Sequence, residues 1–329
     1  MYINEKYINL QLFADMNTQT TASAGMTDEM KTYYSDYLID LVEPELVHDQ
    51  FAQKHPIPKN GGKTIEFRQW DTLPEMTAPI TEGVTPDGQS LSMSTIEATV
   101  EQYGGYVTIS DMLDLTAIDP VLVQATKAIA SQAGRSLDTI TREVLNGGTV
   151  VQYADGSVSS RSALKYTDKT TNNNLTVEAV KKAVRFLEGQ DAPKINGYYI
   201  GIIHPYCKYD LMNDPEWKKP HEYKDTINIY NGEIGELYGV RFVQSTRAKK
   251  FEGAGANGAD VYSTLILGDD AYGVTEIEGG GLEHIVKQRG SAGTADPLNQ
   301  RATAGWKATK VAELLVPQYV VRIETTATP

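Results

Sequence analysis

The stretch IDPVLVQATKAIASQAGRSLDTITREVLNGG, residues 118–148, decides how the rest of the chain is organised. Its apolar residues recur at steps of three and four, which is the spacing of one face of an α-helix. They are Ile118, Val121, Leu122, Ala125, Ile129, Ala133, Leu137, Ile140 and Val144, whereas Lys127, Arg135, Asp138 and Arg142 fall mostly off this face.

The two ends of the stretch carry the signals that start and stop a helix. Asp119 is a good N-cap, and Pro120 suits the first helical position. Asn146-Gly147-Gly148 tolerates the left-handed backbone that terminates helices. The sequence therefore predicts a helix over residues 120–146, roughly 40 Å long. We expect this helix to be the spine of a domain, with sheets laid across it.

The composition is that of a globular protein. The chain has 329 residues, of which 40% are hydrophobic and 22% charged, and this length suffices for two or three domains. No apolar run reaches the roughly 18 residues of a membrane span, and residues 1–15 lack the apolar core of a secretory signal. The single cysteine, Cys207, excludes an intrachain disulfide and a Cys-rich metal site, and indicates synthesis in a reducing cytoplasm.

The formal net charge of −13 bears on the partners of the protein. Binding to duplex DNA is dominated by cationic side chains that meet phosphates, so an acidic surface repels nucleic acid. This balance disfavours a DNA-binding enzyme or regulator. It remains compatible with a protein that encloses DNA without binding it.

The chain before the long helix contains an unusual segment. Residues 1–55 read as a polar N-terminal arm and a first helix over about 28–47. Within residues 56–103, strand-like runs at 63–70 and 92–104 flank DTLPEMTAPITEGVTPDGQSL, which has three prolines and few large apolar residues. Such a loop is rare in a compact monomer, and an isolated hairpin is marginal in water. We therefore expect a long two-stranded arm that another subunit covers.

The rest of the chain alternates helices and strands. A short strand at 106–110 and a small helix at 111–116 lead into the long helix. After it, a helix over 176–188 and strands at 198–204, 238–245, 261–268 and 284–290 follow, of which the part up to about 283 reads as an α/β domain. The closing runs at 301–315 and 318–325 are strand-like, and we expect both to return to the domain of the long helix.

Three local patterns invite an enzymatic interpretation, and their context argues against it. GAGANG (253–258) fits GxGxxG, but a strand-like run follows it where a dinucleotide site needs a helix. Gly62-Lys63-Thr64 resembles the end of a phosphate-binding loop, but Ile57 stands where the first glycine belongs. His204 and Cys207 have ligand-like spacing without a second pair. We therefore predict no catalytic residues, no cofactor and no metal site.

The order of these segments resembles the major capsid proteins of tailed bacteriophages. The resemblance covers nearly the whole chain and is carried by INLQLFA (8–14), the run TEGVTPDGQSLSMSTIEATVEQYGGYVTISD (81–111), IYNGEIGELYGVRFVQS (229–245) and DPLNQRATAGWKATKVAELLVPQYVVRIE (296–324). It implies the α+β Johnson capsid fold, which tailed phages share with the herpesvirus capsid floor and the encapsulins. The implied parts are an N-terminal arm, an extended β-hairpin loop at 56–103, a peripheral domain at 104–170 and 284–329 with the spine helix, and an axial α/β domain at 171–283.

The resemblance also implies a function. A capsid protein assembles with itself, as hexamers and pentamers, into an icosahedral shell around double-stranded DNA, with a portal protein and here a separate scaffolding protein as partners. Its place would be the virion, after assembly in the host cytoplasm. The candidates for intersubunit contacts in the extended loop are Arg68, Trp70, Asp71, Glu75, Glu82 and Asp87. The alternatives are the shell of an encapsulin-type compartment, which encloses a cargo enzyme, and a soluble α/β enzyme.

Overall fold

The computed structural model describes residues 18–19, 46–70, 73–83, 85, 87–117, 121–166, 172–217, 233–278, 282–291 and 296–328. These residues belong to two compact units. Unit 1 contains Gln102–Gly134 and Leu282–Ala308, and unit 2 contains Pro44–Glu101, Arg135–Gly281 and Thr309–Pro329. The helix predicted over 28–47 lies almost entirely outside the described residues.

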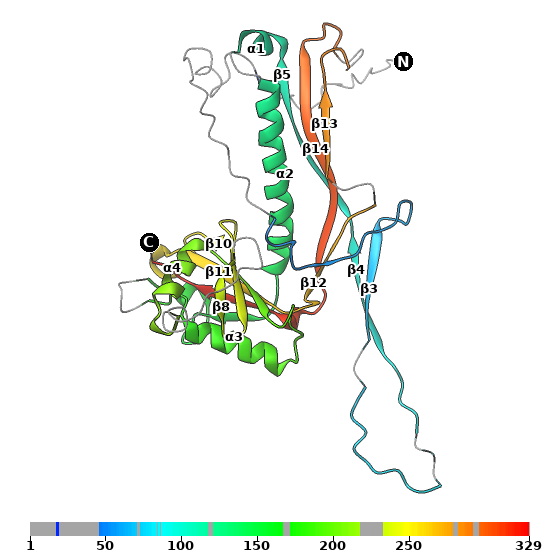
Figure 1. Ribbon diagram of the computed structural model, residues 1–329, viewed down its shortest axis with the longest axis vertical. Helices are drawn as coiled ribbons and strands as arrows, with labels where there is room; N and C mark the ends of the chain where they lie inside the picture. The colour runs from blue at the N-terminus through cyan, green and yellow to red at the C-terminus, as the bar shows by residue number, and fades with distance from the viewer. Residues whose placement is uncertain are drawn as a thin grey trace, which may run out of the picture. The chain divides into compact units, whose positions relative to one another are not determined.

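Unit 1 is a small sheet with helices against it (Figure 1). Its strand β14 pairs with both β5 and β13, and β1 adds to β5 in parallel. Ile109, Leu113 and Val121 form a core between sheet and helices, and the Trp306 ring nitrogen donates to Gln132 at 3.3 Å. Its elements are β1 (Thr18–Gln19), β5 (Glu101–Ser110), α1 (Asp111–Thr116), the first part of α2 (Val121–Leu145), β13 (Glu283–Lys287) and the first part of β14 (Arg301–Leu314).

The long helix α2 occupies nearly all of the range that the sequence predicts. It runs from Val121 to Leu145, and the side chain of Asn146 donates to the carbonyl oxygen of Arg142 at 2.8 Å just beyond its end. The sequence places Asp138 mostly off the apolar face of this helix. The structure shows that Asp138 is nevertheless 2% exposed, because its carboxylate binds His48 within unit 2.

Unit 2 is built on a seven-stranded mixed sheet with the strand order β6-β15-β11-β7-β9-β8 and with β10 also paired to β11. The neighbours β7 and β9 are parallel, as are β6 and β15, whereas β11 runs antiparallel to both β7 and β15. The strands are β6 (Val151–Tyr153), β7 (Tyr199–Ile203), β8 (Glu233–Leu237), β9 (Val240–Gln244), β10 (Lys250–Phe251), β11 (Val261–Leu267) and β15 (Val320–Thr325).

Both faces of this sheet are covered. Helices α3 (Val177–Gly189) and α4 (Pro205–Asn213) pack on the face that carries Tyr199, Phe242 and Ile266. On the opposite face, Ile200, Ile202 and Val243 pack against Leu145 at the end of α2 and against Val47 and Phe51. Burial on both faces explains why β7 reads as a continuous apolar run without alternation. The helix predicted over 176–188 is confirmed as α3, with the Thr176 hydroxyl capping it.

The remaining strands of unit 2 extend from the second part of β14. Strand β12 (Tyr272–Thr275) pairs antiparallel with β14, and β2 (Gln53–Lys54) adds to β12 in parallel. The other two strands, β3 (Thr64–Trp70) and β4 (Met93–Thr99), form a two-stranded sheet of their own. Short 3-10 turns occur at Arg161–Ala163, Ala256–Gly258 and Pro317–Tyr319. The GAGANG segment is such a turn, followed by strand β11.

The expected course of the closing segment needs correction. Residues 284–329 were expected to return as a whole to the domain of the long helix, but they divide between the units near residue 308. Strand β15 pairs with β11 and β6 and is buried along its whole length, so it belongs to the seven-stranded sheet. Strand β6, expected in the same domain as the long helix, joins that sheet too. The predicted strand at 106–110 is the end of the longer β5.

Candidate assembly surface

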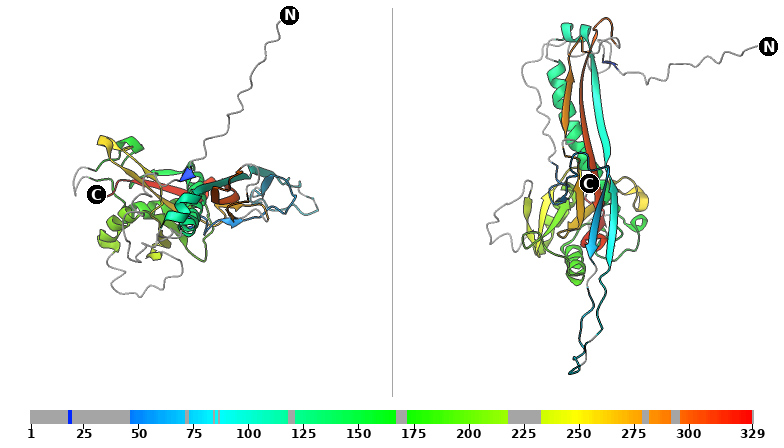
Figure 2. Two further views of the ribbon diagram at one scale, coloured as in Figure 1. Left: turned by 90° about the horizontal axis from the view of Figure 1, so that it is seen from above. Right: turned by 90° about the vertical axis from the view of Figure 1, so that its right-hand side faces the viewer.

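The β3–β4 hairpin is the part of unit 2 that has no core of its own. Its strands pair antiparallel from Thr64↔Thr99 to Trp70↔Met93, and neither strand pairs with another among the described residues. Beyond that last pair, the described residues between 73 and 92 contain no helix or strand and run as an open loop (Figure 2). We call residues 73–92 the arm and residues 53–68, with β2 and most of β3, the foot.

The foot is held to unit 2 by one face of the hairpin. Ile65 lies opposite Ala98 and Phe67 opposite Ile96, so these apolar side chains share a face. A Cβ on Gly273 would lie 3.1 Å from the ring of Phe67, so the glycine lets the hairpin approach β12. Val100 and Ile57 are 2% and 4% exposed, which shows that the hairpin is anchored at its base.

The arm presents apolar side chains to solvent. Ile80 is 74% exposed, Leu91 65% and Met76 63%, and Leu73 is also exposed. Single exposed apolar residues are ordinary, but several on one coreless loop mark an interaction surface. None of these apolar residues is among the six contact candidates predicted from the sequence, five of which are charged. The signal was their position in a proline-rich loop without any apolar partner.

The six residues predicted to form contacts between subunits differ in their positions and in their partners. Arg68 donates to Glu66 of its own hairpin at 2.9 Å, and both side chains are exposed. Glu75, Glu82 and Asp87 are exposed on the arm, with no ion pair among the described residues. Trp70 ends β3 opposite Met93, with its side chain outside the description, and Asp71 lies outside the described residues altogether. The contacts proposed for all six stay predictions.

A cavity of about 720 Å³ opens beside the foot. Ile65, Phe67 and Ile96 line it from the hairpin, and Leu315, Val316 and Tyr319 line it from the rest of unit 2. The polar side chains of the lining are Gln53, His55, Glu66, Arg68 and Asp270, so apolar and polar groups are mixed around the cavity. A cavity with both kinds of group is suited to receive a side chain or a short peptide segment.

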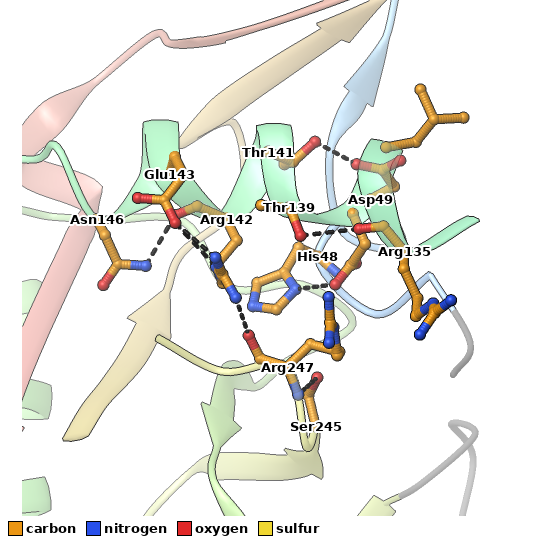
Figure 3. A network of polar contacts seen from close by, with 12 residues as sticks. His48, Asp49, Arg135, Thr139, Thr141, Arg142, Glu143, Asn146, Ser245 and Arg247 are labelled. Atoms are coloured by element: carbon orange, nitrogen blue, oxygen red, sulfur yellow. Dashed lines mark hydrogen bonds and ion pairs between the residues drawn. The ribbon is translucent and has the colours of Figure 1, made fainter. Parts of the chain in front are cut away.

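A second group of polar residues lies buried in unit 2, around the last turns of α2 (Figure 3). The Asp138 carboxylate accepts from the backbone nitrogen of His48 at 2.9 Å and lies 2.8 Å from its Nδ1. Burial by itself would raise the pKa of the Asp138 carboxyl, but the hydrogen bonds and charge of His48 outweigh it and hold that pKa below its ordinary value. Tyr272 donates its hydroxyl to the carbonyl oxygen of His48, and burial raises the pKa of Tyr272 well above its usual range.

Two further contacts tie α2 to its surroundings within unit 2. The Lys310 ammonium on β14 binds the Asp49 carboxylate and donates to the carbonyl oxygen of Leu137 at 2.9 Å, while Thr141 also donates to Asp49. Arg142 donates to the carbonyl oxygen of Arg247 at 2.8 Å and to Glu143 (Figure 3). Burial by itself would raise the pKa of the Glu143 carboxyl, but its hydrogen bonds with Lys249 and Arg142 outweigh this effect and lower the pKa.

This buried network positions chain segments and offers no reacting group to a substrate. His48 is fully buried, and its Nδ1 is held by Asp138. The Cys207 thiol is also fully buried, and burial raises its pKa to about 12, far above that of a nucleophilic thiol. No cluster of three or more metal-ligating side chains occurs within the described ranges. None of the helices seen there combines the length and apolar character needed to cross a bilayer.

A family model described as phage capsid protein matches residues 93–323, which is most of the chain. The chain belongs to this phage capsid protein family. No curated protein matches this capsid protein with significant similarity. The family is structural, and its members are components of the virion.

Solved structures agree with this assignment. The capsid of Ralstonia phage GP4 matches with a TM-score of 0.69 at 14% identity, over 95% of this chain and 99% of that one. The capsid of cyanophage Pam1 matches with a TM-score of 0.66 at 15% identity, over 96% and 98%. The SrpI encapsulin of Synechococcus elongatus matches with a TM-score of 0.58 at 9% identity, over 93% and 96%. At these identities the likeness is one of fold, and it confirms the predicted Johnson capsid fold.

Proposed function

We propose that this capsid protein is the major shell protein of a tailed bacteriophage, whose copies assemble as hexamers and pentamers into an icosahedral shell around double-stranded DNA. The observation that carries the proposal is the arm. An exposed coreless loop with apolar side chains, anchored only at its foot, gains little stability within one subunit, whereas a neighbouring subunit can cover it. Many identical contacts of this kind close into rings and shells.

The same proposal covers the partners and the place of assembly. A separate scaffolding protein and a portal protein would take part, and assembly would occur in the cytoplasm of a bacterial host. A net charge of −13 keeps packed DNA from adhering to the wall, so the genome is enclosed and not bound by sequence. The Arg68, Trp70, Asp71, Glu75, Glu82 and Asp87 side chains remain the charged and aromatic candidates for contacts between copies.

A second candidate is an encapsulin-type compartment, which the likeness to the SrpI encapsulin favours. Expression of the protein alone and electron microscopy of the purified product test both. Large shell-like assemblies are expected for either candidate, of uniform size for the compartment and irregular for the capsid without its scaffolding protein, and a small soluble oligomer would contradict both. Particles purified from phage-producing cells then separate them: copurified double-stranded DNA supports the capsid, and a copurified protein cargo supports the compartment.

A further inference from the structure

The charges of the hairpin are segregated along its length. Residues 71–92 contain Asp71, Glu75, Glu82 and Asp87 and no basic residue, and no Lys, Arg or His occurs between Arg68 and Lys127. Glu75, Glu82 and Asp87 are exposed. The arm is therefore uniformly acidic, and its ideal partner is a surface that offers exposed cations.

The foot of the same hairpin offers such cations. Lys54 lies on β2, and Lys59 and Lys63 flank the turn that leads into β3, where the backbone of Lys63 accepts from Val100 at 2.9 Å. All three side chains are exposed, and none has an ion pair within the part of the chain that the structure describes. The turn between them is fixed by Asn60 and Gly62, which adopt positive φ angles of 67° and 100°.

The acidic residues on the neighbouring segment do not form ion pairs with these lysines. Glu276 and Glu278 lie on the segment that bridges to Ile57 and are exposed, but the described residues show no ion pair between them and the lysines. The remaining cation, Arg68, is bound to Glu66. In unit 2, Lys181 binds Glu216 and Lys194 binds Glu188. The three lysines of the foot, by contrast, have charges that no described acid neutralises.

We propose that the acidic arm of one copy is received by the lysine-bearing foot of a second copy, with an apolar arm residue such as Met76 or Ile80 seated in the cavity beside the foot. The inference rests on the proposed function and names the partner surface of the arm. Acidic arm and basic foot lie on the same chain, so the contact is head to tail, and repetition of such a contact generates rings. The cavity of about 720 Å³, with Ile65, Phe67 and Leu315 among its lining residues, supplies the apolar burial that exposed charge pairs alone do not.

Charge reversal tests this contact. The arm variant carries Glu75→Lys, Glu82→Lys and Asp87→Lys, and the foot variant carries Lys54→Glu, Lys59→Glu and Lys63→Glu. Each variant alone faces like charges at the contact, so the concentration needed for self-association should rise by about tenfold or more at low salt. An equimolar mixture restores opposite charges between copies and should recover the association of the wild type. All six positions are exposed, and unchanged melting temperatures check folding.

A matched control separates position from net charge. Reversal of the exposed Lys127, Lys165 and Lys287 changes the net charge as much as the foot variant does, and this control should associate like the wild type. Sedimentation velocity of the full chain gives the readout for self-association, and electron microscopy gives the separate readout for shells. Charge-dependent small oligomers without shells would support the inference while contradicting the proposed function. A mixture that fails to recover, a control that loses association, or a monomeric wild type overturns the inference.

Discussion

His48 and Asp138 form a buried polar pair that joins the segment before β2 to α2. Their side chains are almost fully excluded from solvent, and the carboxylate accepts two hydrogen bonds from the one histidine. A buried carboxylate destabilises the fold unless its oxygens accept hydrogen bonds. The contribution of each residue of the pair to stability therefore depends on the presence of the other. The contact spans ninety residues of sequence.

We expect the substitution Asp138→Asn to lower the free energy of unfolding by about 1–3 kcal/mol, because an amide cannot match both donors of His48 as a carboxylate does. Denaturant unfolding of free subunits measures this. Asp191→Asn is the matched control, since Asp191 is exposed at a left-handed position that asparagine tolerates, and it should stay within about 0.5 kcal/mol of the wild type. Equal effects of the two substitutions would argue against a structural role for the buried pair.

The same carboxylate predicts a dependence on pH. Its pKa in the folded chain lies below the ordinary value of 3.8, so the unfolded state binds its proton more readily. The stability that it contributes is fully present above pH 3.8 and is lost as the pH falls through the folded pKa. The difference in unfolding free energy between the wild type and Asp138→Asn should therefore shrink as the pH falls below about 4. A difference that grows on acidification would contradict the assignment.

Sequence analysis could not find this pair. A helical pattern shows Asp138 next to Leu137, and a charged residue at such a position is ordinarily solvated. The contact with His48 forms only in the folded chain, and no local signal in the sequence predicts it. The outward charges of the arm, by contrast, follow from sequence alone, because a loop without apolar partners has nothing to bury them.

At the scale of elements, α2 shows what local rules do predict. Asp119-Pro120 and Asn146-Gly147-Gly148 predict limits for the helix that agree with Val121–Leu145 almost to the residue, because capping signals are local in the sequence; the predicted N-cap itself lies outside the described residues. Strand β15 shows what they do not. Its apolar alternation predicts a strand, but its partners β11 and β6 are set by packing across the whole of unit 2, so its assignment to the other domain was wrong.

The glycine within α2 supports a prediction at this scale. A Cβ added to Gly134 would meet nothing within 4 Å, and Gly134 lies inside the helix. We expect Gly134→Ala to raise the free energy of unfolding by up to about 1 kcal/mol, because alanine loses less backbone entropy on forming the helix. Ala128→Gly, at an exposed position of the same helix, should lower it by a similar amount. Urea titrations of both variants decide this, and a destabilised Gly134→Ala would reveal a close neighbour at that position.

At the scale of the whole molecule, net charge governs the response to DNA. We expect free subunits to bind duplex DNA negligibly at about 0.15 M salt, because a net charge of −13 repels the phosphates. The sequence pair Lys249-Lys250 looks like a basic patch, but Lys249 binds Glu143 at 2.6 Å and Lys250 binds Asp260 at 2.8 Å. A gel-shift titration of duplex DNA with the subunits measures this binding, with a basic DNA-binding protein as the positive control. A shift at sub-micromolar subunit would overturn the prediction.

The arm leads to the last prediction, which separates folding from assembly. Trp70 and Met93 end the paired strands directly opposite each other, so the dipeptide Asn-Gly in place of residues 71–92 closes the hairpin with a tight turn that suits its twist. The excised residues that the structure describes are all exposed, so they have no core contacts to lose. Free subunits of this variant should therefore melt cooperatively within a few degrees of the wild type.

Shell formation by the same variant should fail, because each copy loses both the apolar side chains and the acidic charges that a neighbour would receive. Single charge changes on the arm provide the comparison: Glu82→Gln alone should weaken assembly only mildly, since an exposed pair contributes about 0–1 kcal/mol. Calorimetry of the subunits and electron microscopy of assembly reactions measure the two effects separately. Normal shells from the shortened chain would show that the arm is dispensable between copies. Outright unfolding would show that it supports its own subunit, and either result would remove the basis of the proposed arm-to-foot contact.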